Sequence, residues 1–214
     1  MDPLLLIIVA IAALTGVRWF RGVRENRMLI LHATEAMERA FQPEDTKYTN
    51  IGGSIGYNFA YTLSHPYIRL EGTITTLPRH AVFYLPISLW LFHREDLLLF
   101  TLYGEPLEAG LGHIAERERY RHGRLPVEDQ EDLQSMVTTR GSRQYVILYY
   151  NPQIRERLSG FLEALSEAAL ESILYIGYYG NDSHIAVTMN PTKSGLEGAI
   201  TELTGAIADK WLRD

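Results

Sequence analysis

The feature that most constrains this chain is an apolar run at its N-terminal end. Residues 4–17 carry no charge and a single hydroxyl, that of Thr15. Four arginines follow the run at regular spacing: Arg18, Arg21, Arg24 and Arg27. This pattern is typical of one membrane-spanning helix whose basic end stays in the cytoplasm. We therefore expect a single-pass anchor over residues 1–23, with the N-terminus outside and the remaining chain in the cytoplasm.

The length of this run is marginal for a bilayer. As a helix, residues 4–17 extend roughly 21 Å, whereas the hydrocarbon core is about 30 Å thick. A helix that continues from Pro3 through Trp19 and Phe20 spans roughly 27 Å, and Arg18 then directs its guanidinium to the headgroups. The candidate contacts with anionic headgroups are the three arginines nearest the run: Arg18, Arg21 and Arg24.

Two alternatives to an anchor fit the run less well. A cleaved signal peptide needs positive charge before its apolar core. Here the charged residue before the core is Asp2, although residues 10–12 resemble a small-residue cleavage site. A buried core helix is not usually apolar on all sides and then abruptly rich in arginine.

Composition limits what the remaining chain can do. Residues 24–214 have the length of one domain. The chain has no cysteine, which excludes disulfides and thiolate metal sites. Its net charge of −6 argues against a nucleic-acid-binding surface over the whole domain. No DNA partner is therefore expected.

Apolar periodicity predicts an α+β domain after the anchor. Residues 25–41 have apolar positions at helical spacing, and this helix is expected to run on from the anchor. Asn151-Pro152 and Asn190-Pro191 each have the pattern of a helix start, with Asn as cap and Pro in the first turn. Strands are predicted over 57–63, 67–75, 97–103, 144–150, 172–179 and 184–189. We expect a mostly antiparallel sheet with helices packed on it, and a loop over 44–56.

Residues 81–92 are the most ambiguous segment of the chain. They are apolar at nearly every position and include Pro86. Periodicity does not distinguish a kinked buried helix from a strand paired with residues 97–103, and we favour the helix. If exposed, such a segment is a site for a partner or for lipid. The candidate partner-binding residues are Phe83, Tyr84, Leu89, Trp90 and Phe92.

Residues 105–143 are charged and irregular, which predicts a surface insertion or long hairpin with a short helix around 128–136. A basic cluster in this region precedes an acidic one. The basic side chains are candidate contacts with an anionic surface, either lipid or RNA: Arg117, Arg119, Arg121 and Arg124. A run of this kind is more often the solvated strand of an extended hairpin, and that alternative stays open.

No constellation in the sequence predicts catalysis. Residues 52–56 match the G-x-S-x-G pattern around Ser54, but a nucleophile elbow needs a buried strand before it and a helix after it. None of the seven histidines forms a short metal-ligand spacing with another. We expect no cofactor, no metal and no small-molecule substrate, and hence a non-catalytic binding domain. A membrane-tethered hydrolase using Ser54 and a self-associating scaffold are the alternatives.

The order of elements resembles that of the calumin family. An N-out anchor, a basic link and a helix precede a strand ending in EGTITTL at residues 71–77 and an apolar segment. A strand at 97–103, a strand–helix pair at 145–169 and a closing strand–Asn-Pro–helix at 185–211 follow. This family comprises single-pass endoplasmic-reticulum proteins with a cytosolic α+β domain, which work with a translocon-associated intramembrane chaperone in membrane-protein insertion. The resemblance implies an insertion or translocon protein as partner, and it offers no catalytic residue.

Two departures limit what this resemblance implies. The family has an acidic lumenal segment linked to calcium binding, whereas residues 1–3 alone precede the apolar run here. The family also ends in a long basic coiled coil that reaches the ribosome, whereas this sequence stops at Asp214. Calcium binding and a coiled-coil contact with the ribosome are therefore not expected.

Overall fold

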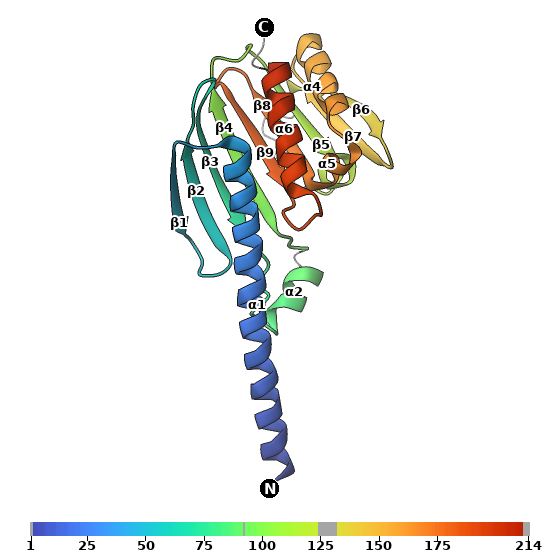
Figure 1. Cartoon of the computed structure of the whole chain (residues 1–214). Helices are drawn as coiled ribbons and strands as arrows, with labels where there is room; N and C mark the ends of the chain where they lie inside the picture. Colours follow the sequence, from blue (N-terminus) through green and yellow to red (C-terminus); the bar gives the residue numbers. More distant parts are fainter. Residues whose placement is uncertain (1, 92, 124–131, 212–214) are drawn as a thin grey trace.

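One long helix connects a projecting apolar segment to the rest of the protein. A computed structural model describes residues 2–91, 93–123 and 132–211. Helix α1, Pro3–Phe41, is continuous over 39 residues, and its N-terminal half projects away from the sheet (Figure 1). The Asp2 carboxylate caps it by accepting a hydrogen bond from the Leu4 amide at 3.0 Å, and Gln42 ends it in a left-handed conformation. The expected anchor and the expected helix at 25–41 are thus one element.

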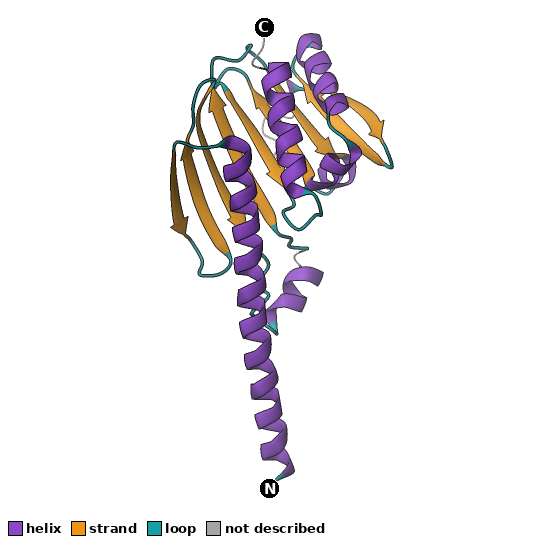
Figure 2. Cartoon of the chain, in the orientation of Figure 1, coloured by secondary structure: helices purple, strands orange, loops and turns teal. Residues whose placement is uncertain are grey.

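The nine strands of the described chain form one antiparallel sheet (Figure 2). In chain order they are β1 Asp45–Asn50, β2 Gly56–Thr62, β3 Tyr67–Thr75, β4 Leu97–Gly104, β5 Leu111–Glu116, β6 Gln134–Arg140, β7 Arg143–Tyr149, β8 Ile173–Tyr179 and β9 His184–Met189. Their order across the sheet is β1-β2-β3-β4-β9-β8-β5-β7-β6. Pairing of β4 with β9 therefore joins the first four strands to the last five in one continuous sheet.

The longer helices cover one face of this sheet. The helices that follow α1 in the described chain are α2 Tyr84–Trp90, α3 Arg117–Arg121, α4 Pro152–Ala164, α5 Glu167–Ser172 and α6 Leu196–Trp211. Helices α1, α4 and α6 lie over the same face (Figure 1), and α5 packs against α6. This arrangement confirms the prediction of an α+β domain with helices packed on an antiparallel sheet.

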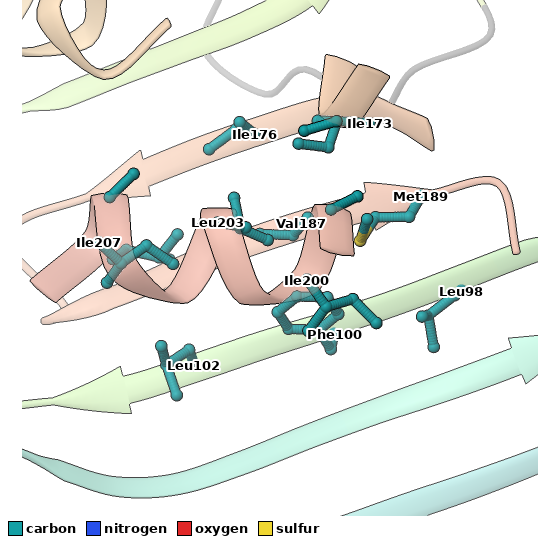
Figure 3. Close-up of a cluster of buried hydrophobic side chains, with 14 of the residues drawn as sticks. Leu98, Phe100, Leu102, Ile173, Ile176, Val187, Met189, Ile200, Leu203 and Ile207 are labelled. Carbon is teal, nitrogen blue, oxygen red and sulfur yellow. The ribbon is translucent and has the colours of Figure 1, made fainter. Parts of the chain in front are cut away.

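The main core lies between that face and the helices. Figure 3 shows Ile200 and Leu203 of α6 beside the side chains of β4, β8 and β9, including Phe100 and Val187. Side chains of a strand alternate between its two faces, and accordingly every second residue over much of β4 is buried. The C-terminal half of α1 adds its own buried face to this protein interior: Gly22, Asn26, Ile30, Ala33, Ala36, Met37 and Phe41.

Strand β1 occupies much of the segment predicted as a loop over 44–56. All six of its residues are exposed, so the apolar alternation that predicts a strand is missing. It is an edge strand, held by pairing with β2 and by Tyr48. The Tyr48 hydroxyl donates to the Glu38 carboxylate of α1 at 2.5 Å and also bonds the Tyr61 hydroxyl at 2.6 Å. Burial and the hydrogen bond to Glu38 raise the pKa of Tyr48.

Residues 105–143, expected as a surface insertion or long hairpin, contribute strands β5 and β6 to the sheet. Strand β5 lies between β8 and β7, and its residues 112–115 are buried. Strand β6 forms the sheet edge beyond β7. The sequence did not predict β5 as a strand, because its apolar stretch is short and charged residues flank it. Of the helix expected around 128–136, the part up to residue 131 lies outside the described residues, and Met136 lies in β6.

The two Asn-Pro pairs play different structural roles. Asn151 begins α4 as predicted, because its side-chain oxygen accepts from the Ile154 amide at 2.8 Å. Asn190 does not begin α6, which starts at Leu196. Its side-chain oxygen instead accepts from the Thr192 amide at 2.9 Å and from the Thr192 hydroxyl at 2.6 Å. The second Asn-Pro is therefore a turn before the helix.

Candidate functional site

A close contact joins α1 to the segment that precedes α2. Gly22 of α1 lies against the backbone of the loop before α2. A Cβ at position 22 would be 2.4 Å from the Arg79 carbonyl carbon and from the His80 nitrogen. One turn further along α1, the Asn26 side chain donates to the Leu77 carbonyl at 2.8 Å and accepts from Arg79 at 3.0 Å. This contact needs a residue without a side chain at position 22 and a buried amide at position 26.

An ion pair completes this contact. The Arg79 guanidinium donates two hydrogen bonds to Asp96, at 2.6 and 2.7 Å. The Asp96 carboxylate, 3% exposed, also accepts from the Leu77 amide at 2.9 Å. The hydrogen bonds from Arg79 to Asp96 raise the pKa of the Arg79 guanidinium. Both ends of the segment 77–96 are thereby fastened beside α1. We call the following group the clamp: Gly22, Asn26, Leu77, Arg79 and Asp96.

Helix α2 lies between the two fastened ends, and it is apolar and exposed. Residues 81–91 contain no acidic or basic side chain, and Ser88 is the buried residue of the helix. Phe83 is 76% exposed and Trp90 is 83% exposed. The other large apolar side chains of this surface are also exposed: Tyr84, Ile87, Leu89 and Leu91. The structure thus brings the predicted candidates together, except Phe92, which lies outside the described residues.

The anchor arginines lie at the same level of α1 as the clamp. Arg18, Arg21 and Arg24 are all exposed, and no ion pair joins them to another residue in the described part of the chain. Arg24 also lines a groove of about 850 Å³ between α1 and the turn before α6, together with His32 and Lys193. This end of the domain is therefore basic as well as apolar.

The second group of arginines is placed on α3 and not on a hairpin strand. Arg119 is engaged within the domain, because its guanidinium donates two hydrogen bonds to Glu95, one of them at 2.8 Å. These bonds raise the pKa of Arg119. Arg117 and Arg121 lie on the same short helix, and Arg124 lies outside the described residues.

The described residues leave much of the sheet face turned away from α1, α4 and α6 uncovered. A broad hollow of about 910 Å³ lies over β1 to β4, β8 and β9. Polar side chains line much of it, including Lys47, Asn58, Glu71, Thr73, Thr101 and Thr188. Helix α3 covers this face at the β5–β7 end, where Tyr120 packs against the buried cluster of Ala115, Val146, Leu148 and Tyr175. We call the uncovered part the open face.

A row of rings crosses the open face at one end of the hollow. The Arg69 guanidinium of β3 lies 4.2 Å from the centre of the Tyr103 ring of β4. The His184 ring of β9 lies 5.4 Å from Tyr103 and stacks on Tyr179 of β8 at 4.5 Å. The Tyr179 hydroxyl lies 3.1 Å from the Tyr175 hydroxyl. We call this group the ring row; its flat faces and hydroxyls can pack against an amphipathic surface.

His113 of β5 is the buried end of the ring row. Its Nδ1 lies 2.9 Å from the Tyr175 hydroxyl, and among the described residues its Nε2 has no hydrogen-bond partner. Burial lowers the pKa of His113 to about 4, so the imidazole is neutral at neutral pH. Gly177 leaves the space for these rings, since a Cβ there would lie 2.5 Å from the Tyr175 hydroxyl. Sequence reasoning missed this group because its members come from separate strands; the alternation Tyr175, Gly177, Tyr179 was the available signal.

Ser54 lies in the hairpin turn between β1 and β2. A strand follows it, so the strand-to-helix turn of a nucleophile elbow is not formed there. Among residues 2–91, 93–123 and 132–211, no group of three His, Asp or Glu side chains is arranged to hold a metal ion.

By length and composition, α1 is able to cross a membrane. Its most apolar window of 18 residues has a mean hydropathy of 2.1, and none of that window is buried in the protein. The segment is thus free along its whole length to be surrounded by lipid.

Comparisons with known proteins show no family. No protein-family model and no curated protein matches the chain. Among solved structures, the chain is similar to the crystal structure of the mycobacterial trehalose monomycolate transport factor A, TtfA. The sequence identity is 10%, the match covers 77% of this chain and 72% of that one, and the TM-score is 0.33. A similarity at this level carries no argument about function.

Proposed function

We propose that this chain is a single-pass, membrane-anchored, non-catalytic binding protein whose domain is held on the cytoplasmic side. The observation that carries the proposal is the continuity of α1. The apolar half of this helix is exposed, and the same helix enters the core of the domain through Met37 and Phe41. Because no flexible linker separates the two halves, the orientation of the span sets the orientation of the domain. The arginines after the apolar run favour the cytoplasmic side.

In this proposal the open face binds the partner. An antiparallel sheet commonly leaves one face solvated, so the polar lining of the hollow is not distinctive by itself. The ring row is distinctive, because it places stacked rings and hydroxyls from several strands on one surface. Confinement to the bilayer surface favours an integral membrane protein as partner. The resemblance to the calumin family suggests a component of the membrane-insertion machinery.

Site-specific photo-crosslinking in membranes tests this function. A photoreactive residue replaces Thr101 in the hollow, and a matched control replaces Gln153 on the outer side of α4. We expect position 101 of the full chain to crosslink to one integral membrane protein, identified by mass spectrometry, and position 153 not to. The product should be lost when Tyr103→Ala and His184→Ala are combined. Equal products from both positions, or none from position 101, would contradict the assignment of the open face.

A further inference from the structure

We infer that α2 is a second membrane contact: an interfacial helix whose exposed apolar side chains lie in the headgroup layer of the bilayer that α1 crosses. The inference rests on the proposed anchoring by α1. It adds a contact, away from the axis of α1, that fixes the height and tilt of the domain above the membrane.

The clamp places α2 at the level where the span ends. Phe20 is the last residue of the expected span, and Gly22, which contacts Arg79 and His80 before α2, lies roughly 3 Å further along the helix axis. The headgroup region adds about 5–7 Å to each side of the hydrocarbon. Figure 1 shows α2 alongside α1, between the sheet and the projecting half of the helix. A helix in this place reaches the zone where α1 leaves the hydrocarbon.

The composition of α2 suits this zone. No charged side chain interrupts residues 81–91, and its exposed residues include the aromatic rings of Phe83, Tyr84 and Trp90. Aromatic residues are enriched at the membrane–water interface. Interfacial helices bury an apolar face about 5–10 Å into the boundary between headgroups and acyl chains. A continuous apolar surface is rarely left in water without a use.

Several polar groups of α2 are paired within the helix, which lowers the cost of placing it in an apolar environment. The Leu85 amide donates to the Ala81 carbonyl at 2.8 Å, and the Leu91 amide donates to the Ile87 carbonyl at 2.9 Å. The Ser88 hydroxyl donates to the Leu85 carbonyl at 2.8 Å. The nearby charge of the clamp is also neutralised, because Arg79 is paired with Asp96.

Lipid is the occupant that these observations favour over a protein. The apolar surface belongs to a short projecting helix, and α2 lines neither the hollow of the open face nor the groove beside α1. It continues the apolar surface of α1 toward the domain, and it lies at the level of exposed basic side chains. Arg18 and Arg21 there suit anionic headgroups. Every copy anchored by α1 meets lipid at this level, whether or not a partner is present.

Tryptophan fluorescence of the full chain in vesicles tests the inference. The chain has three tryptophans, so W19F combined with W211F leaves Trp90 alone, and W90F combined with W211F leaves Trp19 alone. Each protein is reconstituted into vesicles of phosphatidylcholine and phosphatidylglycerol without other proteins. We expect blue-shifted Trp90 emission, and greater loss of emission with bromine in the upper acyl chain than with bromine near the bilayer midplane.

The two single-tryptophan proteins separate failure of this inference from failure of the anchor. If lipid bromine quenches Trp19 but not Trp90, and Trp90 has the emission of a water-exposed indole, the interfacial helix is contradicted and the anchor is supported. Trp19 unquenched as well would overturn both. Protection of Trp90 that requires an added membrane-protein extract would assign α2 to a protein partner and also overturn the inference.

A charged variant provides a second test in the Trp90 protein. Phe83→Glu combined with Leu89→Glu places two carboxylates on the surface of α2, at positions that are 76% and 45% exposed. We expect this variant to lose most of the Trp90 quenching by lipid bromine. The control is Ile51→Glu combined with Val137→Glu, at similarly exposed apolar positions away from α2, and it should retain the quenching. Equal quenching in both variants would contradict lipid contact through α2.

Discussion

His113 links the ring row to the stability of the domain. Its side chain is fully buried, its Nδ1 bonds the Tyr175 hydroxyl, and it stacks near that ring with centroids 5.8 Å apart. Protonation would place a charge in a buried site, and burial accordingly lowers the pKa of His113 from 6.5 to about 4. A neutral imidazole is therefore part of the folded state.

This residue predicts a pH dependence of unfolding. Between about pH 6.5 and 4, His113 is protonated in the unfolded chain and neutral in the folded chain. Because the unfolded state binds the extra proton, the free energy of unfolding falls as the pH falls. The contribution approaches about 3 kcal/mol at the acid end. His113→Gln removes the titrating group, and chemical denaturation in detergent should show a shallower loss of stability over this range. Parallel pH profiles for the two proteins would contradict a depressed pKa.

At the scale of elements, the packing of α1 on residues 77–80 holds α2 in place. Gly22→Leu would drive a side chain into the backbone of Arg79 and His80, which cannot move aside as a flexible side chain would. We expect a loss of about 1–3 kcal/mol in the free energy of unfolding. Faster hydrogen exchange of the amides in residues 77–91 should accompany it, because the Asn26–Leu77 hydrogen bond is displaced.

Gly16→Leu is the matched control for this prediction. It makes the same change in the same helix, but nothing lies within 4 Å of the added Cβ. Stability and exchange in residues 77–91 should match those of the unchanged chain. If Gly22→Leu also leaves the exchange of this segment unaltered, the clamp does not determine the position of α2.

Elements with a clear apolar period could be predicted from the sequence. The strand at 67–75 has the predicted bounds, and α4 begins at its Asn-Pro pair as expected. Strand β1 could not be predicted, because an edge strand with every residue exposed has no apolar side. The position of β5 inside the sheet depends on pairing with β7 and β8, which local patterns do not encode.

The candidate site was predictable only in part for the same reason. The apolar surface of α2 is visible as an uninterrupted run in the sequence. The clamp joins residues on α1 to residues more than fifty positions later, and the ring row joins β3, β4, β8 and β9. Such groups arise from strand order and register, and single segments carry no signal for them.

At the scale of the whole molecule, our account has α1 and α2 together set the orientation of the domain relative to the membrane. In our account α1 supplies an axis through the membrane, and it ends in the core beside Phe100. In our account α2 supplies a second point of contact away from that axis, so rotation about α1 is restricted. The open face then points in a fixed direction along the bilayer surface, which favours a partner that is itself in the membrane.

Cysteine labelling tests the anchored, cytoplasmic domain most directly, because the chain has no cysteine of its own and each introduced thiol is unique. Single cysteines replace Asp2, Leu14 and Asn58 in the full chain, and intact cells are treated with a membrane-impermeant maleimide before and after permeabilisation. We predict labelling at position 2 from outside, labelling at position 58 only after permeabilisation, and none at position 14 in either state. Labelling of position 58 in intact cells, or of position 14 at any stage, would contradict the account.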